Sequence, residues 1–394
     1  MVNIHNYERM IATTLERIRR SSELSEANRE FILCFKDYLQ SEGIGIAKIN
    51  RYLGDLMKFN RLLGKQFDKA TKEDIRRVVS AIHNEPLSEQ TKRCFKILLR
   101  KFYCYLRNID EKGVYPEEVK WMKMAIGQRH KKLPEELLTE EEIKKIVQAC
   151  TCIRDKALIA TLAESGCRIS EIGIMQIKHI LFEPYGARLS VTGKTGARKI
   201  LVVTSTPYLQ EWINSHPKNT DPELFLWIHP KTGLLCYHRI LAILKSAAVR
   251  VGIKKRVHPH LLRHSKATQL ASIMSDSQLK NYLGWTQGSN MAGIYVHMSG
   301  KDTDDAILRV NHIDTNQTEK DPALQPLTCL RCKAINPATH RFCNICGFAL
   351  DEKAAQSILI QESKHKDLDV IMNLLMKDKE VLELLTQKIK EVKL

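Results

Sequence analysis

The sequence predicts a mainly α-helical protein with a small antiparallel β-sheet, and three observations lead to this fold class. Across most of the 394 residues, apolar side chains recur at spacings of three and four, the period of one face of an α-helix. One stretch, 188–203, instead holds two short β-rich runs joined by a glycine-containing turn, which is typical of a β-hairpin. Hydrophobic residues make up 43% of the chain, which excludes a disordered protein.

Residues 1–128 have the pattern of a helical bundle throughout. Apolar side chains recur at helical spacing over 31–39 and 52–63, and Thr71, followed by Lys-Glu-Asp, is typical of a capped helix start. A further helix is predicted over 88–109, with six cations beside its apolar face: Lys92, Arg93, Lys96, Arg100, Lys101 and Arg107. A basic bundle can clamp a nucleic-acid duplex through its phosphates. An ordinary helical bundle explains this segment equally well when it is taken alone.

Two polar, proline-containing stretches divide the rest of the chain. We interpret 129–138 and 313–328 as interdomain linkers. A second domain, 139–312, lies between them and opens on a capping box at Thr139 with Glu142. Its pattern is helical except for the hairpin, and the last linker is followed by a cysteine-rich module, 329–350.

The charge of the chain points to a polyanionic partner. The net charge is +17; residues 353–394 hold eight basic and seven acidic side chains and 321–352 hold three of each, so +16 lies in residues 1–320. A basic surface of this size suits nucleic acid, because each neutralised phosphate releases counterions, although a merely solvated surface is the plain alternative. The N-terminus has no secretory signal and no apolar run approaches the ~18 residues of a membrane span, so we expect a cytoplasmic protein with reduced thiols and no membrane partner.

Five residues of the second domain supply the groups needed to break a phosphodiester with a tyrosine nucleophile. Arg168 follows a Ser-Gly turn, His260 and Arg263 share one face of a predicted helix, and Tyr295 lies on a later helix. Lys194 lies near the tip of the hairpin. Arginine suits a phosphate clamp because its planar fork donates in pairs and keeps its charge. A tyrosine, with an ordinary pKa of about 10, needs nearby cations or a base to attack.

The motifs around these residues are similar to those of the tyrosine recombinase (phage integrase) family, and most like those of archaeal integrases. The motifs are Ser165-Gly166-Cys167-Arg168-Ile169-Ser170-Glu171, Pro259-His260-Leu261-Leu262-Arg263-His264, Leu283-Gly284-Trp285 and Ile294-Tyr295-Val296-His297, together with the hairpin turn Gly193-Lys194-Thr195. The resemblance covers roughly residues 20–312. The interval from Trp285 to Tyr295 is one residue longer than the commonest spacing in the family.

The resemblance implies a role for each residue. Tyr295 attacks the scissile phosphate and forms a 3′-phosphotyrosine, while Arg168 and Arg263 hold the non-bridging oxygens. His260 assists proton transfer from the tyrosine, and Lys194 protonates the leaving 5′ oxygen. Two further roles follow, for Trp285, which packs and donates its indole N–H to the phosphate, and for Glu171, which orients the arginine and the histidine.

Several residues remain open as alternatives to these assignments. Arg198 and Lys199 share the hairpin with Lys194, so either can replace it as the acid. Tyr282 is the rival nucleophile, although its place in a helix favours a core residue. Three histidines are expected to be structural or to face phosphate: His258, His264 and His297.

The same resemblance implies an architecture and an activity. We expect a helical core-binding (SAM-like) domain over 1–128 and a catalytic domain over 139–312, acting on double-stranded DNA as a homotetramer through a Holliday junction. The predicted activity is site-specific DNA recombination, with no cofactor in the strand-transfer chemistry and no small-molecule substrate. The competing hypotheses are a non-catalytic DNA-binding architectural protein of the same fold and a type IB-like topoisomerase.

The C-terminal part lies outside the resemblance. Cys329-x-x-Cys332 and Cys343-x-x-Cys346 have the spacing of a structural zinc ribbon, with two disulfides or unrelated cysteines as the alternatives. Residues 351–394 are predicted to form one amphipathic helix. Its apolar residues recur at heptad spacing: Leu368, Ile371, Leu375, Leu382, Leu385, Ile389 and Val392, with a break at Asp378. This pattern fits a coiled-coil seam or contact with a neighbouring subunit, and equally a helix that folds back on the zinc module.

Overall fold

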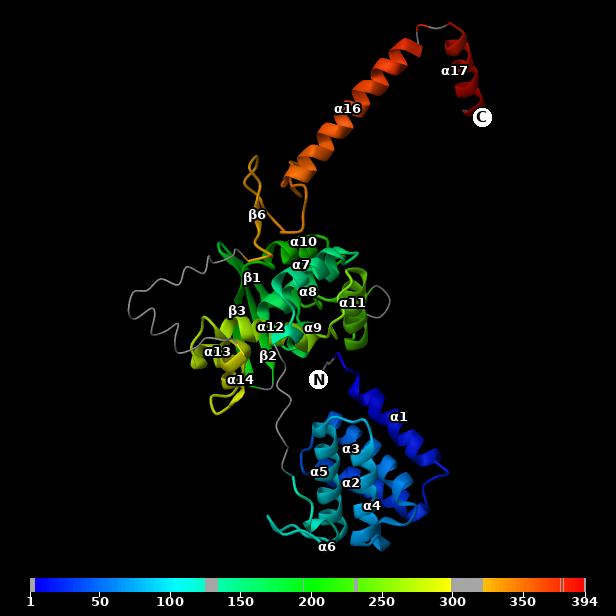
Figure 1. The fold of residues 1–394 in the computed structure, drawn as a ribbon, viewed down its shortest axis with the longest axis vertical. Coiled ribbons are helices and arrows are strands. Elements are labelled where there is room, and N and C mark those ends of the chain that lie inside the picture. The colour runs from blue at the N-terminus through cyan, green and yellow to red at the C-terminus, as the bar shows by residue number, and fades with distance from the viewer. Residues whose placement is uncertain are drawn as a thin grey trace, which may run out of the picture. The chain divides into compact units, whose positions relative to one another are not determined.

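The protein is described here by a computed structural model that covers residues 4–124, 134–193, 195–229, 233–298, 322–375, 377 and 379–392. The chain divides into two compact units, residues 1–132 and 133–394 (Figure 1). Within the described residues, no helix has the length and apolar character that a membrane crossing requires.

The N-terminal unit is a bundle of helices. They are α1 (Tyr7–Arg20), α2 (Glu26–Ser41), α3 (Ile46–Leu63), α4 (Lys72–Asn84), α5 (Glu89–Leu106) and the short α6 (Glu117–Lys120). Local sequence sets three of the helix starts, because the side chains of Ser25, Thr71 and Ser88 accept hydrogen bonds from the first turns of α2, α4 and α5. The prediction of a helical N-terminal domain is confirmed.

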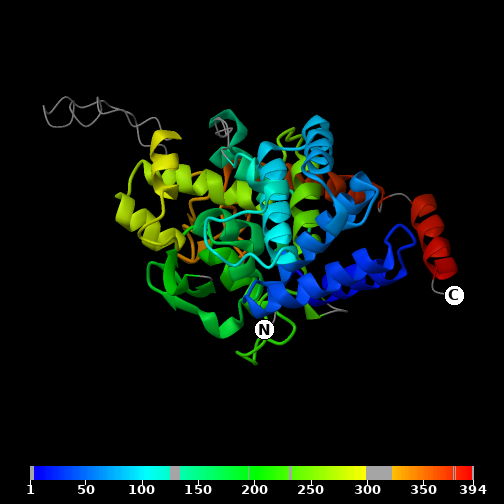
Figure 2. The same ribbon diagram turned by 90° about the horizontal axis from the view of Figure 1, so that it is seen from below.

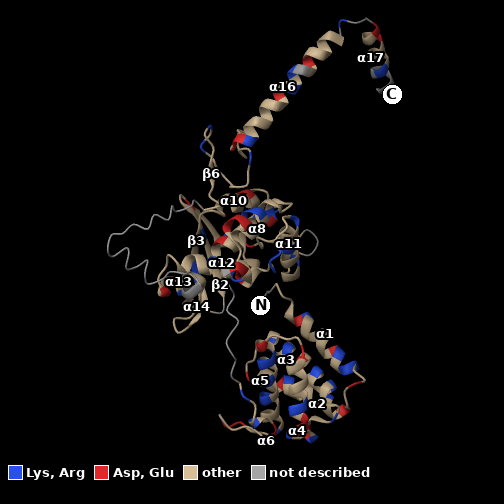
Figure 3. Ribbon diagram, viewed as in Figure 1, with Lys and Arg blue, Asp and Glu red and all other residues tan. Residues whose placement is uncertain are grey.

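Aromatic residues fill the core of this bundle. Phe35, Phe59, Phe67 and Phe102 are fully buried, and the Tyr103 hydroxyl donates to the carbonyl oxygen of Phe67 at 3.0 Å. Lysine and arginine are spread along α1 to α5 (Figure 3).

Two of the six cations predicted on α5 bind the segment that follows α6. Arg93 and Arg100 donate to the carbonyl oxygens of Met124 and Met122. These two arginines therefore help to hold the end of the unit against α5.

The second unit is mainly helical and contains one three-stranded sheet. Its helices are α7 (Glu140–Gln148), α8 (Ile153–Ser165), α9 (Ile169–Gly173), α10 (Thr206–Asn214), α11 (Tyr237–Arg250), α12 (Pro259–Ala271), α13 (Asp276–Leu283) and α14 (Met291–Met298). The sheet is antiparallel, in the order β1 (Ile180–Glu183), β2 (Gly186–Gly193), β3 (Gly196–Val202), and a two-residue pair, β4 (Ile228–His229) and β5 (Gly233–Leu234), lies apart from it. The predicted hairpin is β2–β3, with Leu189 opposite Ile200, and β1 is a strand that the sequence pattern did not indicate.

Helix α8 is the centre of this unit. Most of its side chains are buried, and it packs against α7, α10, α12 and β3. Small residues such as Ala157 and Ala160 on α8 allow this close approach. Helices α13 and α14 lie beside α12 in both views (Figures 1 and 2), and the three share a core with Tyr295. The ends of α8 and α13 meet the first half of α12 near the start of α9.

The C-terminal part of the second unit begins with a segment that packs against α7. Leu324 is buried, and the backbone N–H of Ala323 donates to the side chain of Glu140 at 3.0 Å. The stretch predicted as a second linker is thus packed from residue 322 onward. The short strands β6 (Leu327–Thr328) and β7 (Ile335–Asn336) then pair antiparallel.

The tail contains two helices where the sequence predicted one. They are α16 (Glu352–Leu375) and α17 (Lys379–Val392). The backbone N–H of Lys377 donates to the carbonyl oxygen of Leu374, a three-residue turn that departs from the α-helical pattern and ends α16. Residue 378 and the side chains at 385, 389 and 392 lie outside the described part of the chain.

Candidate active site and cysteine cluster

Arg168 occupies the turn between α8 and α9. Gly166 ends α8 in the left-handed conformation, at φ 57°, where a β-carbon would lie 3.0 Å from the side chain of Leu283. The Arg168 backbone then caps α9, donating to Glu171 Oε2 at 2.9 Å. Its guanidinium donates to Glu171 Oε1 at 2.8 Å and to the carbonyl oxygen of Gly284 at 2.9 Å. Hydrogen bonds therefore fix both the backbone and the guanidinium of Arg168.

Arg263 is buried on α12 and reaches the same turn from the other side. Its Nη1 donates to the carbonyl oxygen of Gly166 at 2.8 Å, and its Nη2 donates to that of Leu283 at 2.8 Å. Burial, with the nearby charge of Arg168, lowers the pKa of Arg263 to about 10, so the guanidinium keeps its charge at neutral pH. The two arginines thus donate to consecutive carbonyl oxygens at the end of α13.

Gly284 is required where these arginines meet. It ends α13 at φ 64°, and a β-carbon there would lie 2.5 Å from Nη1 of Arg198. Its carbonyl oxygen also accepts from the Thr195 hydroxyl at 3.0 Å, beside the bond from Arg168. A larger residue would separate α13 from the β2–β3 hairpin.

Tyr295 lies on α14 and is only 2% exposed. Its ring stacks on Trp285, with centroids 5.3 Å apart and planes at 10°, and the Arg263 guanidinium lies over that indole at 5.5 Å. The hydroxyl lies 2.5 Å from Nδ1 of His264. Burial raises the pKa of Tyr295 while the charge of Arg263 opposes this, so the phenol is protonated at neutral pH.

The structure therefore gathers five of the predicted residues in one place. They are Arg168, Arg263, Glu171, Trp285 and Tyr295. His260 is exposed on α12, three residues before Arg263. Lys194 lies outside the described residues, although its neighbours Gly193 and Gly196 end the paired part of the hairpin. The side chain of His297 is also outside the described part.

Two residues at the site were not assigned to it by sequence reasoning. Arg198, weighed as an alternative acid, is instead bound to Glu171 through both terminal nitrogens, at 3.1 and 2.9 Å. Glu171 thus orients two arginines, where the sequence reasoning predicted an arginine and a histidine. His264, expected to be structural or to face phosphate, contacts the Tyr295 hydroxyl. Its position directly after Arg263 was the one feature of the sequence that could have indicated a place at the site.

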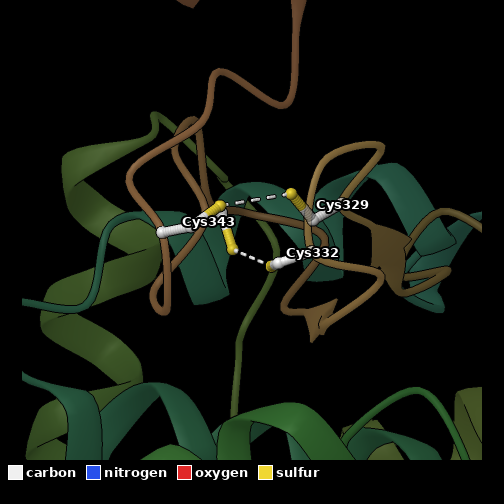
Figure 4. A group of neighbouring side chains, drawn as sticks. Cys329, Cys332 and Cys343 are labelled. Carbon is white, nitrogen blue, oxygen red and sulfur yellow. Dashed lines mark hydrogen bonds between the residues drawn. The ribbon is translucent and has the colours of Figure 1, made fainter.

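The four clustered cysteines come together in a group that can hold a metal ion. Their ligand atoms all lie within 4.8 Å of one another. Sγ of Cys329 is 3.6 Å from that of Cys346, and Sγ of Cys332 is 3.5 Å from that of Cys343. All four thiols are free. Figure 4 shows Cys329, Cys332 and Cys343 with their sulfur atoms gathered in one place. A disulfide needs a sulfur separation of about 2.0 Å, so the disulfide alternative does not describe this arrangement.

The cysteine module contacts α10 of the same unit. The Tyr208 hydroxyl lies 3.0 Å from the Thr339 hydroxyl and accepts from the Thr339 backbone N–H at 3.2 Å. His340 Nε2 lies 3.2 Å from the Glu211 carboxylate. These contacts place the module on the helix that also packs against α8.

Comparisons with known proteins agree with this architecture. The Phage integrase family model matches residues 136–301, and the model of its N-terminal SAM-like domain matches residues 32–108. A tyrosine recombinase from Thermosipho africanus (strain TCF52B) is 26% identical over 279 residues, which cover 66% of this chain and 92% of that protein.

Two solved structures share the fold. XerH recombinase bound to a palindromic difH substrate, in a post-cleavage complex, has a TM-score of 0.56 and 19% identity and covers 78% of this chain and 98% of its own. A lambda integrase tetramer bound to a Holliday junction has a TM-score of 0.55 and 16% identity, and covers 70% of this chain and 78% of its own. The family matches span both the helical bundle and the arginine–tyrosine site, and the chain belongs to the phage integrase, or tyrosine recombinase, family.

Proposed function

We propose that this site-specific recombinase cuts and rejoins double-stranded DNA through a 3′-phosphotyrosine formed on Tyr295. One observation carries the proposal: two buried or half-buried arginines meet at one turn beside a buried tyrosine. This is the set of charges that phosphoryl transfer needs, because negative charge builds on the non-bridging oxygens while an oxygen nucleophile attacks in line. The chemistry uses no metal and no nucleotide, because the phosphotyrosine keeps the bond energy for rejoining.

Arg168 and Arg263 bind the scissile phosphate. Each guanidinium has more N–H donors than its bonds to protein oxygens use, so donors remain for phosphate oxygens. The protein carbonyls fix the direction of these donors before DNA arrives. Such pre-orientation avoids reorganisation when the transition state forms.

The remaining residues complete the assignment. His260, which is exposed on α12 three residues before Arg263, serves in proton transfer. Lys194 protonates the leaving 5′ oxygen. Trp285 supports the nucleophile through the ring stack and offers its indole N–H to the phosphate. Glu171 holds Arg168 in place.

We propose duplex DNA as the substrate and a homotetramer on a Holliday junction as the working assembly. The charge of +16 on residues 1–320 supports the first proposal. The likeness in fold to a lambda integrase tetramer on a Holliday junction supports the second. We assign residues 1–128 to DNA clamping and 139–312 to catalysis. An enzyme that recombines chromosomal DNA works on the nucleoid, which places it in the cytoplasm.

We propose that the cysteine cluster holds one structural zinc ion. Zinc bound by four thiolates at about 2.3 Å has sulfur–sulfur edges of about 3.8 Å, close to the separations of 3.5 and 3.6 Å found here. Four protein ligands complete a tetrahedron, so the ion has no position for a substrate. Its role is to fold the module that docks on α10.

The proposed function is tested with two supercoiled plasmids, one of which carries the DNA that flanks the gene of this protein. A recombinase acts on the plasmid with the flanking DNA and leaves the other supercoiled. Relaxation of both plasmids would identify a topoisomerase instead. Tight, salt-sensitive binding to both with no strand cutting would identify an architectural DNA-binding protein.

A further inference from the structure

The turn of the β2–β3 hairpin is tied to the end of α13. Gly193 opposite Gly196 is the last pair of the two strands, and Thr195 is the residue of the turn that directly precedes Gly196. The Thr195 hydroxyl donates to the carbonyl oxygen of Gly284 at 3.0 Å, and this glycine is buried. The two residues are 89 positions apart in the sequence, so the bond is a tertiary contact of the turn.

The same carbonyl oxygen also binds the proposed phosphate clamp. Nη2 of Arg168 donates to it at 2.9 Å, beside the bond from Thr195. A carbonyl oxygen has two lone pairs, so it can accept both bonds at once. One atom of Gly284 therefore positions a proposed phosphate ligand and the hairpin turn together.

The two strands of the hairpin have contacts of their own with the site. Arg198 on β3 binds both carboxylate oxygens of Glu171 and donates through Nε to the carbonyl oxygen of Tyr282 at 3.0 Å. A β-carbon on Gly193 would lie 2.3 Å from Glu171 Oε1, so β2 also approaches this carboxylate closely. These contacts hold the strands, whereas the bond from Thr195 holds the turn itself.

We infer that Thr195 is a positioning residue, whose hydroxyl holds the hairpin turn in the conformation that directs the general acid at the leaving 5′ oxygen. The inference rests on the proposed function, in which Lys194 is that acid, and Lys194 directly precedes Thr195 in the sequence. In the step concerned, the Tyr295 oxygen forms a bond to phosphorus and its proton passes to His260. The bond from phosphorus to the 5′ oxygen breaks, and that oxygen takes a proton from the Lys194 ammonium. Thr195 exchanges no proton and acts only through its neighbour.

The flexibility of lysine gives this hydrogen bond its importance. A lysine ammonium sits on a long, flexible stem, so its reach depends on how well the backbone that carries it is fixed. A hydrogen bond shifts a conformational population by about 2- to 12-fold, the range that corresponds to its typical net free energy. Removal of the Thr195 hydroxyl should therefore slow proton donation by a similar factor. Arg168 keeps its own bonds to Gly284 and Glu171, so the phosphate clamp is unchanged.

The test compares two duplexes in single-turnover formation of the covalent adduct by the full chain. One is a nicked suicide duplex that the wild type cleaves, and the other carries sulfur in place of the bridging 5′ oxygen at the cleavage position. Sulfur leaves without a proton, so the second duplex does not need the general acid. The ratio of the two rates, sulfur over oxygen, rises when the acid is impaired. This ratio does not depend on the folded fraction of a preparation, because the same protein cuts both duplexes.

Four variants are compared with wild type. Thr195→Val removes the hydroxyl and keeps the shape of the side chain, whereas Thr195→Ser keeps a hydroxyl in the same place. Thr195 and Thr192 are both exposed, and Thr192→Val makes the same change on β2 as a matched control. Lys194→Ala removes the proposed acid itself and sets the upper limit of the ratio.

We expect Thr195→Val to form the adduct about 2- to 12-fold more slowly than wild type on the oxygen duplex and at the wild-type rate on the sulfur duplex. Thr195→Ser and Thr192→Val should match wild type on both duplexes. Equal slowing of Thr195→Val on the two duplexes would mean that the hydroxyl does not act through the acid, and would overturn the inference. A wild-type rate for Thr195→Val on the oxygen duplex, or an equal loss in Thr192→Val, would overturn it as well.

Lys194→Ala separates this inference from the proposed function. If the wild type forms no Tyr295-dependent adduct, or if sulfur does not restore the rate of Lys194→Ala, the proposed function or its assignment of the acid fails, and the role of Thr195 fails with it. If Lys194→Ala recovers on the sulfur duplex while Thr195→Val behaves like wild type on both, the proposed function stands and the role of Thr195 alone is refuted.

Discussion

Arg198 and Glu171 form a salt bridge through both terminal guanidinium nitrogens and both carboxylate oxygens, at 3.1 and 2.9 Å. The glutamate side chain is 1% exposed and also accepts from Arg168. A β-carbon on Gly193 would lie 2.3 Å from Oε1, so the hairpin rests directly on this carboxylate. One buried glutamate therefore sets the position of a proposed phosphate ligand and of the β2–β3 hairpin.

Arg198→Ala is expected to destabilise the second unit strongly. It leaves Glu171 buried with part of its pairing lost, which typically costs about 3–5 kcal/mol. The matched control is Arg188→Ala, which removes another bidentate salt bridge of the same sheet, the one between Arg188 and Glu183. The Arg188 side chain is 37% exposed, so its loss should change stability far less. Urea unfolding measures both; equal effects would contradict the role of the buried pair.

The stability of the second unit should fall with acidification through Glu171. Burial raises the pKa of this carboxyl, but the hydrogen bonds and charge of Arg198 and Arg168 outweigh burial, so its pKa is lowered on folding. Its contribution is complete above the ordinary glutamate pKa of about 4.3 and is lost as pH falls through the folded value. Between pH 7 and 3.5, wild type should therefore lose more unfolding free energy than Glu171→Gln. Parallel pH profiles for the two chains would refute this account.

The zinc assignment predicts a distinction between clustered and isolated cysteines. Cys343→Ser removes one of the four clustered thiols, whereas Cys236→Ser removes an exposed thiol at the start of α11. Native mass spectrometry should find about one zinc ion in wild type and in Cys236→Ser, and none in Cys343→Ser. Limited proteolysis should then cut the Cys343→Ser chain near residues 329–350. Metal-free wild-type protein, freshly purified without chelator, would rule out the site.

The tail is expected to mediate contacts between protomers on DNA. Leu368, Ile371 and Leu375 are exposed on α16 at heptad spacing, and an exposed apolar seam is typical of helix pairing. Truncation after residue 365 should reduce the assembly of complexes larger than one protomer on DNA. Leu368→Lys, on the seam, should weaken assembly, and Val370→Lys, an exposed position off it, should not. Light scattering measures the size of the DNA complexes that each variant forms. Unchanged assembly after truncation would rule out this role of the tail.

Sequence patterns predicted most helices because caps and helical periodicity are local signals. The hairpin was equally clear from its glycine turn, whereas β1 is short and exposes Leu181 and Phe182, so it lacks the alternation of a half-buried strand. The motif positions were also readable. The contacts between side chains could not be predicted in this way. Arg198 contacts residues 27 and 84 positions away in the sequence, and His264 contacts Tyr295, which is 31 positions away. Such contacts depend on packing that no local pattern records.

Covalent trapping of the protein on DNA tests the central claim most directly. The full chain is incubated with nicked suicide duplexes taken from DNA flanking its own gene, and adducts are separated on a denaturing gel. Tyr295→Phe should bind these duplexes and form no adduct, while Tyr282→Phe, which alters the rival tyrosine, should form adducts like wild type. Adduct formation that survives Tyr295→Phe would contradict the assignment of Tyr295 as the nucleophile.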